Sequence, residues 1–238
     1  MLKNLVTPAL EELFKAAEAD PENADVHYLT ALVYLRQGVE ALDMGERVQC
    51  LKGVARDEQR QRATRHFTAA KKELIRAVQC RPTFSDALNA LAVVEMHLGE
   101  HDAAIAHVRA ALANVLYREP FAGLGNLGWA YYQKRDLNHA ASELRQAVTQ
   151  QPRFCVGRYR LGQVYFDQNN WEAALAELEQ VAQDSSCPIQ EAYYLLGLTY
   201  AKLSRGQEKI AQAFQTCERL APRSCLAEEC RRYARLVH

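Results

Sequence analysis

Residues 117–152 read YREPFAGLGNLGWAYYQKRDLNHAASELRQAVTQQP, and this stretch decides the fold. It contains a G-x-G-x-x-G pattern at Gly123, Gly125 and Gly128, which is typical of a dinucleotide-binding turn when it follows a strand and opens a helix. The same residues also fit a helix–turn–helix unit, with Gly128 in the first helix and Ala140 in the second. The two interpretations differ in one respect, because only the helix–turn–helix unit is expected to recur along the chain.

The pattern does recur. Small residues that directly follow a leucine stand at Ala92, Gly128, Gly162 and Gly197, at steps of 36, 34 and 35 residues. Twelve residues after the first three come Ala104, Ala140 and Ala174. A period near 34 with helix–turn–helix spacing is the signature of the tetratricopeptide repeat, or TPR. Small residues at these positions let the two helices of a repeat approach closely, while large apolar residues fill the remaining space.

The period predicts an all-α fold, a right-handed TPR superhelix that forms one domain over residues 1–238. This α-solenoid is built of antiparallel helix pairs and ends in a C-terminal capping helix. Its predicted parts are a half repeat (1–21), a repeat with a long helical insertion (24–83, insertion 39–66), four further repeats (85–116, 121–152, 155–186, 190–222) and the capping helix (223–238). A half repeat cannot bury its apolar face alone, so we expect the natural chain to continue upstream.

The insertion over residues 39–66 is rich in basic side chains. They are Arg47, Lys52, Arg56, Arg60, Arg62 and Arg65. We expect two extended helices that join near Gly53 and form a solvated, charged hairpin. The alternative is a basic contact surface for a partner or for lipid head groups.

The sequence contains two patterns typical of cofactor or metal sites, but the residues around each pattern argue against such a site. Arg118-Glu119-Pro120, rather than a strand, precedes the G-x-G-x-x-G pattern, so we reject a cofactor site. His97 and His101 have the spacing of helical metal ligands, but Gly99 separates them at a predicted turn. Lys+Arg and Asp+Glu both number 29, which gives no charge argument for nucleic acid. We therefore predict no enzyme, no cofactor, no metal and no nucleic-acid partner.

The first helix of each repeat is expected to line the concave surface of the superhelix. Counting from the predicted helix starts places a set of largely aromatic and apolar residues there. These are Asn89, Val93, Met96, Trp129, Tyr132, Tyr159, Gln163, Phe166, Tyr194 and Leu198. Aromatic side chains exposed in a groove are typical anchors for a bound peptide or helix. The alternative is that some of them pack between neighbouring repeats.

A more specific resemblance rests on residues 113–183. Leu116-Tyr117-Arg118-Glu119-Pro120 lengthens the link between two repeats, and Asn126, Gly128 and Lys134 follow it at fixed spacing. This combination resembles the TPR pilotin lipoproteins of type IV pilus systems, and the insertion and the cysteines suggest a divergent branch such as the gliding-motility pilotin of myxobacteria.

The resemblance implies a lipoprotein on the periplasmic face of the outer membrane. Such a protein binds secretin subunits and promotes their assembly into the pilus pore. It also implies a lipid anchor on residues upstream of this chain, and we expect a monomer. The alternatives are a generic TPR adaptor, cytoplasmic or periplasmic, and a fragment of a TPR-containing enzyme such as a glycosyltransferase. No catalytic domain accompanies the repeats, which argues against the last.

The seven cysteines bear on the compartment. A periplasmic location, which the resemblance implies, predicts disulfides. Cys217 and Cys225 lie on either side of the Ala221-Pro222 turn and form one candidate pair, with Cys230 as the alternative partner of Cys217. Cys155 and Cys187 form the second candidate pair. Cys50 is expected to lie far from Cys80, and the odd count leaves at least one free thiol.

Overall fold

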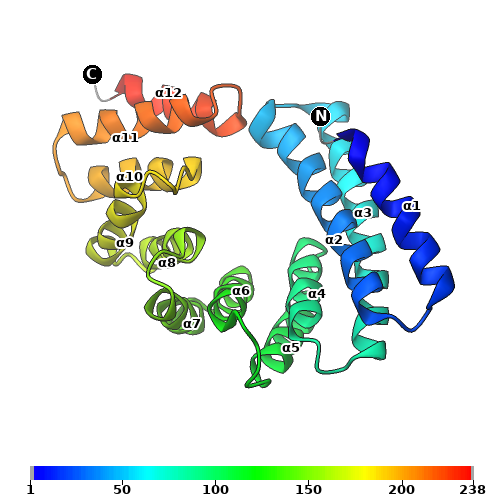
Figure 1. Ribbon diagram of the computed structural model, residues 1–238. Helices are drawn as coiled ribbons and strands as arrows, with labels where there is room; N and C mark the ends of the chain where they lie inside the picture. Colours follow the sequence, from blue (N-terminus) through cyan, green and yellow to red (C-terminus); the bar gives the residue numbers. More distant parts are fainter. Residues whose placement is uncertain (1–2, 237–238) are drawn as a thin grey trace.

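The computed structural model describes residues 3–236, and these residues contain helices and no strand (Figure 1). The helices are α1 (Lys3–Ala19), α2 (Ala24–Asp43), the π-helical turn η1 (Met44–Val48), α3 (Gly53–Cys80), α4 (Ser85–His97), α5 (His101–Leu112), α6 (Pro120–Gln133), α7 (Leu137–Gln150), α8 (Cys155–Asp167), α9 (Trp171–Gln183), α10 (Gln190–Lys202), α11 (Gln207–Leu220) and α12 (Cys225–Leu236). The prediction of an all-α TPR solenoid is confirmed. The ends of the predicted half repeat (residues 1–2) and capping helix (237–238) lie outside the described residues.

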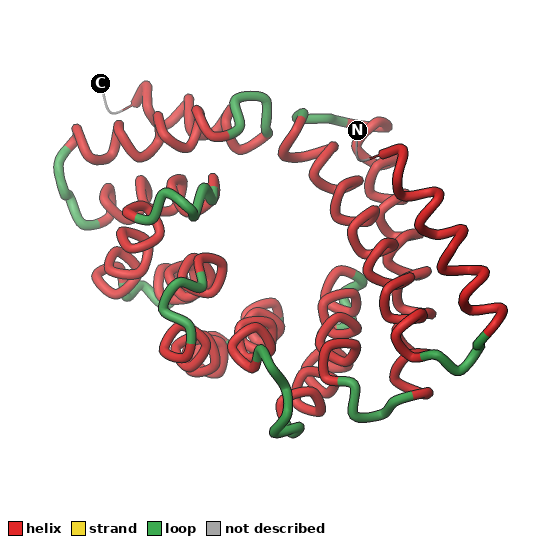
Figure 2. The backbone as a smooth tube through the Cα atoms, in the orientation of Figure 1, coloured by secondary structure: helices red, strands yellow, loops and turns green. Residues whose placement is uncertain are grey.

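Consecutive helices pack as pairs, and the pairs follow one another around a curve. The largest contacts join α2 to α3, α4 to α5, α6 to α7, α8 to α9 and α10 to α11. The first helices of successive pairs, α4, α6, α8 and α10, also touch one another in that order. The curve brings the far end of the α2–α3 hairpin next to the turn between α11 and α12 (Figures 1 and 2). The described helices therefore form a nearly closed ring.

The turns inside the repeats follow the same period as the helices. A residue with positive φ follows the end of the first helix in each of four repeats. These residues are Gly99, Arg135, Asn169 and Ser204, with φ values of 80°, 64°, 59° and 52°. A left-handed residue after the last helical turn ends a helix, and glycine adopts this conformation at least cost. Gly99 separates His97 from His101, which are the last residue of α4 and the first residue of α5.

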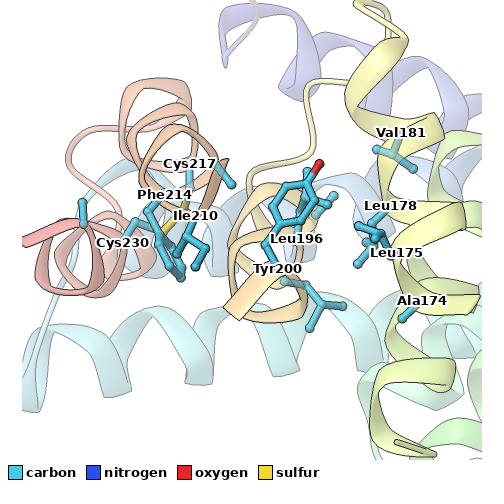
Figure 3. Close-up of a cluster of buried hydrophobic side chains, with 14 of the residues drawn as sticks. Ala174, Leu175, Leu178, Val181, Leu196, Tyr200, Ile210, Phe214, Cys217 and Cys230 are labelled. Carbon is cyan, nitrogen blue, oxygen red and sulfur yellow. A yellow bond between two sulfur atoms is a disulfide. The ribbon is translucent and has the colours of Figure 1, made fainter. Parts of the chain in front are cut away.

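The core lies between the two helices of each repeat and between neighbouring repeats. Ala92, Ala104, Ala140 and Ala174 have no exposed surface. A Cβ atom on Gly128 would lie 2.6 Å from Leu144 Cγ, so this glycine lets α6 and α7 approach closely. In the C-terminal half, Leu178, Leu196 and Phe214 belong to one buried cluster that also includes Cys217 and Cys230 (Figure 3).

The hairpin insertion is largely exposed to solvent, and its tip also makes a contact that the sequence did not predict. The chain turns over residues 49–52, and Gly53 begins α3 with a φ of 58°. The tip contacts the other end of the solenoid, where Arg47 pairs with Glu191 and Lys52 pairs with Glu228. Arg47 and Lys52 stay exposed to solvent in these pairs. Sequence alone does not show that the curvature of the solenoid brings acidic residues of α10 and α12 opposite the basic tip.

The structure contains three disulfides. Cys155 is bonded to Cys187, as in one candidate pair, and Cys217 is bonded to its alternative partner, Cys230. The pairing of Cys217 with Cys225 is wrong, because Cys225 is bonded to Cys50, 175 residues away in the sequence. Cys80 is a free, exposed thiol. The ligand atoms of Cys155, Asp184 and Cys187 lie together, but both of these sulfurs belong to a disulfide.

None of the helices within residues 3–236 combines the length and apolar character that crossing a membrane requires.

A buried carboxylate gives the fold a pH dependence. Glu95 is 2% exposed and accepts a hydrogen bond of 2.8 Å from Nδ1 of His107. This hydrogen bond raises the pKa of His107 above 6.5. Because the folded pKa exceeds the unfolded one, the stabilisation is fully present below about pH 6.5 and is lost as the pH rises through the folded value.

We therefore expect the urea concentration at the unfolding midpoint to decrease as the pH is raised from about 6 to about 8.5. The His107→Gln variant should show a smaller decrease over the same pH range. An unchanged slope in the His107→Gln variant would contradict the assignment.

Candidate functional site

The sequence-predicted groove residues lie on four successive first helices. Asn89, Val93 and Met96 belong to α4, Trp129 and Tyr132 to α6, Tyr159, Gln163 and Phe166 to α8, and Tyr194 and Leu198 to α10. Nine of the ten are partly exposed, as groove-lining residues are expected to be. Met96 is 7% exposed and packs in the core cluster with Ala92 and Leu127. It therefore contributes to packing rather than to the surface of the groove.

A chain of polar contacts crosses α4, α6 and α8. Asn126 Nδ2 donates a hydrogen bond of 3.1 Å to Asn89 Oδ1, and Arg160 Nη1 donates one of 3.2 Å to Asn126 Oδ1. The Arg160 guanidinium also lies over the Trp129 ring, 4.9 Å from its centre. Burial lowers the pKa of Arg160 to about 10, which leaves it charged at neutral pH. These contacts fix the orientation of the Trp129 ring.

Trp129 begins a second set of contacts toward the other end of α6. Its ring stacks on Tyr132 with centres 4.7 Å apart. The Tyr132 hydroxyl donates to Asp167 at 2.7 Å and accepts from Gln163 Nε2 at 3.1 Å. Burial, together with the bond to Asp167, raises the pKa of Tyr132 to about 12, and burial also raises the pKa of Tyr159. Both phenols stay neutral at physiological pH, and their rings provide flat apolar surface with a polar edge.

A cavity of about 420 Å³ lies next to these side chains. Trp129, Tyr159 and Arg160 line one side, and Glu191, from the start of α10, lines another. Arg47 from the hairpin tip also lines it. The cavity therefore draws its walls from helices in the middle of the chain and from the N-terminal insertion.

A second, larger cavity of about 850 Å³ lies where the two ends of the solenoid meet. Its walls carry both basic and acidic side chains, together with Cys50 and Cys225. The two cavities share Arg47, Gln190 and Glu191. The two cavities therefore adjoin each other where the ends of the solenoid meet.

The structure does not bring all the predicted residues together. Trp129 and Tyr159 line the 420 Å³ cavity, whereas Tyr194 faces the last helix. The Tyr194 hydroxyl donates to Glu229 at 3.3 Å, and its ring packs edge-on against Tyr233. The α12 helix thus covers the part of α10 that carries Tyr194.

Sequence reasoning did not place Arg47, Arg160 and Glu191 beside Trp129 and Tyr159, with which they line the 420 Å³ cavity. A signal for Arg160 does exist, because it stands two positions before Gly162 just as Asn126 stands two positions before Gly128. Arg47 carries no such signal, since it lies in the insertion and outside the repeat register.

Comparisons with known proteins agree with the geometry. Two sequence profiles of the tetratricopeptide repeat match the chain, one over residues 59–115 and 159–224 and the other over residues 122–154. No curated protein matches the sequence.

Three similar solved structures cover nearly the whole chain. PilF from Pseudomonas aeruginosa has a TM-score of 0.71 at 17% identity, covering 97% of this chain and 91% of that one. PilW, described as a widely conserved type IV pilus biogenesis factor, has a TM-score of 0.70 at 14% identity, covering 96% and 98%. YrrB, described as a TPR protein with an unusual peptide-binding site, has a TM-score of 0.57 at 17% identity, covering 94% and 99%. At these identities the similarity shows a shared fold.

Proposed function

This chain belongs to the tetratricopeptide repeat family, and from that premise we propose that it is a non-catalytic periplasmic scaffold for pilus assembly. In this proposal it binds secretin subunits and promotes their localisation and assembly at the outer membrane, for type IV pilus biogenesis and motility. A lipid anchor on residues upstream of this chain would hold it at the periplasmic face of that membrane.

The observation that carries the proposal is the full-length similarity to two pilus proteins. PilF and PilW match this chain almost from end to end, so the similarity extends over the whole series of helix pairs and is not confined to a single repeat. The LYREP link and the Asn126, Gly128 and Lys134 positions point to the same family of pilotins. A fold shared at low identity does not define a partner by itself, so secretin binding is the part that needs direct measurement.

The three disulfides support a periplasmic location. Disulfides persist in oxidising compartments such as the bacterial periplasm and are rare in the cytosol. Six of the seven cysteines are paired in the structure. This usage favours a periplasmic protein over a cytoplasmic one.

The groove around Trp129 and Tyr159 is the proposed contact site. Large aromatic side chains at the centre of an interface contribute most of its binding energy, particularly when their orientation is fixed before binding. Arg160 and Tyr132 fix Trp129 from two sides. The adjoining cavity has room for one or more side chains of a bound segment.

The second candidate function is that of a TPR adaptor in another assembly pathway. The similarity to YrrB favours it, because that protein is described as having a peptide-binding site of its own. The two candidates share the groove and differ in the partner.

Trp129→Ala and Tyr159→Ala are each expected to weaken the affinity for purified secretin periplasmic domains by about 30-fold or more, as expected for hot-spot aromatics. Titration calorimetry measures the change. Circular dichroism checks that both variants keep their helical content.

Phe14→Ala is the matched control for this titration. Phe14 is an exposed aromatic on α1, which contacts only α2 among the described helices. It should bind like the unmodified chain. Normal secretin binding by both groove variants would exclude the groove as the contact site, and no binding by the unmodified chain would favour the adaptor alternative.

A further inference from the structure

The two ends of the solenoid meet at a small set of contacts, which we call the seam. The seam joins the hairpin tip, residues 44–52, to Glu191 and residues 223–229. Cys50 and Cys225 are bonded across it, with their Cα atoms 4.5 Å apart. The Cys50 N–H also donates a hydrogen bond of 2.9 Å to the Arg223 carbonyl.

Two ion pairs complete the seam. Arg47 Nη2 lies 2.6 Å from Glu191 Oε1, and Lys52 Nζ lies 3.3 Å from Glu228 Oε2. Both basic side chains are exposed, and ion pairs of this kind contribute little because water and salt screen them. The disulfide is therefore the dominant connection between the two ends.

The seam disulfide is also open to reagents in solution. Cys50 and Cys225 are both partly exposed and line the 850 Å³ cavity. Cys217 and Cys230, by contrast, have no exposed surface. Thiol–disulfide exchange requires that a thiolate reach a sulfur atom, so a thiol reductant should reach the seam disulfide well before it reaches Cys217–Cys230.

The two sides of the seam are each held by bonds that do not depend on the disulfide. On one side, Ser224 Oγ donates to Gln190 Oε1 at 2.9 Å, and Gln190 Nε2 donates to the Cys217 carbonyl at 2.8 Å. On the other side, the Leu51 N–H donates to the Gly45 carbonyl at 3.0 Å. Loss of the disulfide should therefore separate two preserved pieces rather than unfold either one.

We propose that Cys50–Cys225 is a redox-operated clasp that holds the solenoid closed. A dithiol reductant attacks one of the two sulfurs as its thiolate and forms a mixed disulfide with it, and the other cysteine leaves as a thiolate that takes up a proton. The second thiol of the reductant then displaces the remaining cysteine and becomes a disulfide itself. The chain gains two thiols, and the hairpin tip separates from residues 223–229 on the other side of the seam.

Opening the clasp changes the groove. Arg47 then moves away from Glu191, and the 420 Å³ cavity loses the wall that the hairpin tip supplies. The shape of the binding surface thus depends on the oxidation state of two residues that lie outside the repeat register. This inference concerns the closure of the solenoid and does not depend on which partner it binds.

The test begins with disulfide mapping during a titration with a mild dithiol. Mass spectrometry should find Cys50 linked to Cys225 in the oxidised protein and should find this bond reduced before Cys217–Cys230. Absence of the link in oxidised protein would overturn the proposal.

The decisive readout is amide hydrogen exchange at position 50, followed by NMR. In the Cys50→Ser/Cys225→Ser variant, exchange at position 50 should become at least tenfold faster because its bond to Arg223 is lost. The exchange rate of the Leu51 amide should stay unchanged, because this amide donates its hydrogen bond to Gly45 within the hairpin tip. The radius of gyration from small-angle scattering should increase.

The matched control is the Cys155→Ser/Cys187→Ser variant, which removes a disulfide away from the seam. It should keep slow exchange at position 50 and the compact radius. If position 50 stays equally protected and the radius is unchanged after the seam disulfide is lost, the clasp proposal is wrong. None of these measurements involves a secretin, so their outcome is independent of the proposed partner.

Discussion

Replacing Phe214 with alanine is expected to lower the free energy of unfolding by about 3–5 kcal/mol. Phe214 is 1% exposed and lies in the cluster between α10, α11 and α12 (Figure 3). Its ring stacks on Tyr233 with centres 5.2 Å apart and meets Tyr194 edge-on at 6.0 Å. Its ring also fills the space over Gly197, where a Cβ atom would lie 2.8 Å from two of the ring carbons. The loss combines the transfer energy of the ring with the cost of the cavity that it leaves.

Urea unfolding followed by circular dichroism measures this loss. Phe14→Ala is the control, since Phe14 is 44% exposed and its removal should change stability by less than about 1 kcal/mol. Similar losses in the two variants would show that Phe214 does not lie in the core of the C-terminal repeat.

The second large effect is expected from Gly128→Ala, at about 2–3 kcal/mol. The new Cβ atom would lie 2.6 Å from Leu144 Cγ and 3.0 Å from the Ala140 carbonyl oxygen. A side chain can turn aside, but the backbone oxygen of α7 cannot, so α6 and α7 must move apart. The change in thermal midpoint and urea midpoint reports the cost.

Gly45→Ala is the matched control for this variant. Gly45 is also buried, but a Cβ atom there would meet only Gln59, at an ordinary distance of 3.5 Å. Alanine should be tolerated at this position or should stabilise the protein slightly, because glycine has the greater freedom to lose on folding. A tolerated Gly128→Ala would contradict the close approach of α6 and α7.

The repeat architecture was predictable because it depends on local spacing. Each repeat needs a small residue where its two helices cross, and Gly128, Gly162 and Gly197 supply it at nearly constant steps. The recurrence also argues against a dinucleotide-binding site at the G-x-G-x-x-G pattern. In the structure, Gly128 lies within α6 and packs against α7. Local spacing of this kind predicts the packing of the helices correctly because each repeat contacts only its neighbours.

Ring closure was not predictable, because it depends on rotation accumulated over many repeats. Cys50 and Cys225 are separated by 175 residues, and small changes of angle at each repeat decide whether they meet. The position of Arg47 in the wall of the 420 Å³ cavity follows from that closure. No periodic signal in the sequence contains this information.

The choice between Cys225 and Cys230 as the partner of Cys217 depended on a rotation about one helix axis. Five residues along an α-helix turn through about 500°, so the two side chains point about 140° apart. In the structure Cys230 faces α11 and Cys225 faces the hairpin tip. The sequence places both near Cys217 but does not fix which of them points toward it.

Met96 illustrates the same limit for the groove. Its position in α4 predicts a surface residue, but α4 contacts α2, α3, α5 and α6 and is buried on several sides. Trp129 and Tyr159, by contrast, are partly exposed and line the 420 Å³ cavity. The register therefore assigns a residue to a position on its helix, but it does not decide how much of the side chain stays exposed.

Site-specific photocrosslinking in living cells tests most directly whether the inner face binds a secretin. A photoreactive amino acid replaces Tyr132 in one strain and Phe14 in another, and the crosslinked products are identified by mass spectrometry. Tyr132 stacks on Trp129 in the proposed contact site, whereas Phe14 lies on α1. We predict that the Tyr132 position yields a crosslink to secretin and that the Phe14 position yields none. Crosslinks from Tyr132 that contain no secretin, or equal secretin crosslinks from both positions, would contradict the proposed function.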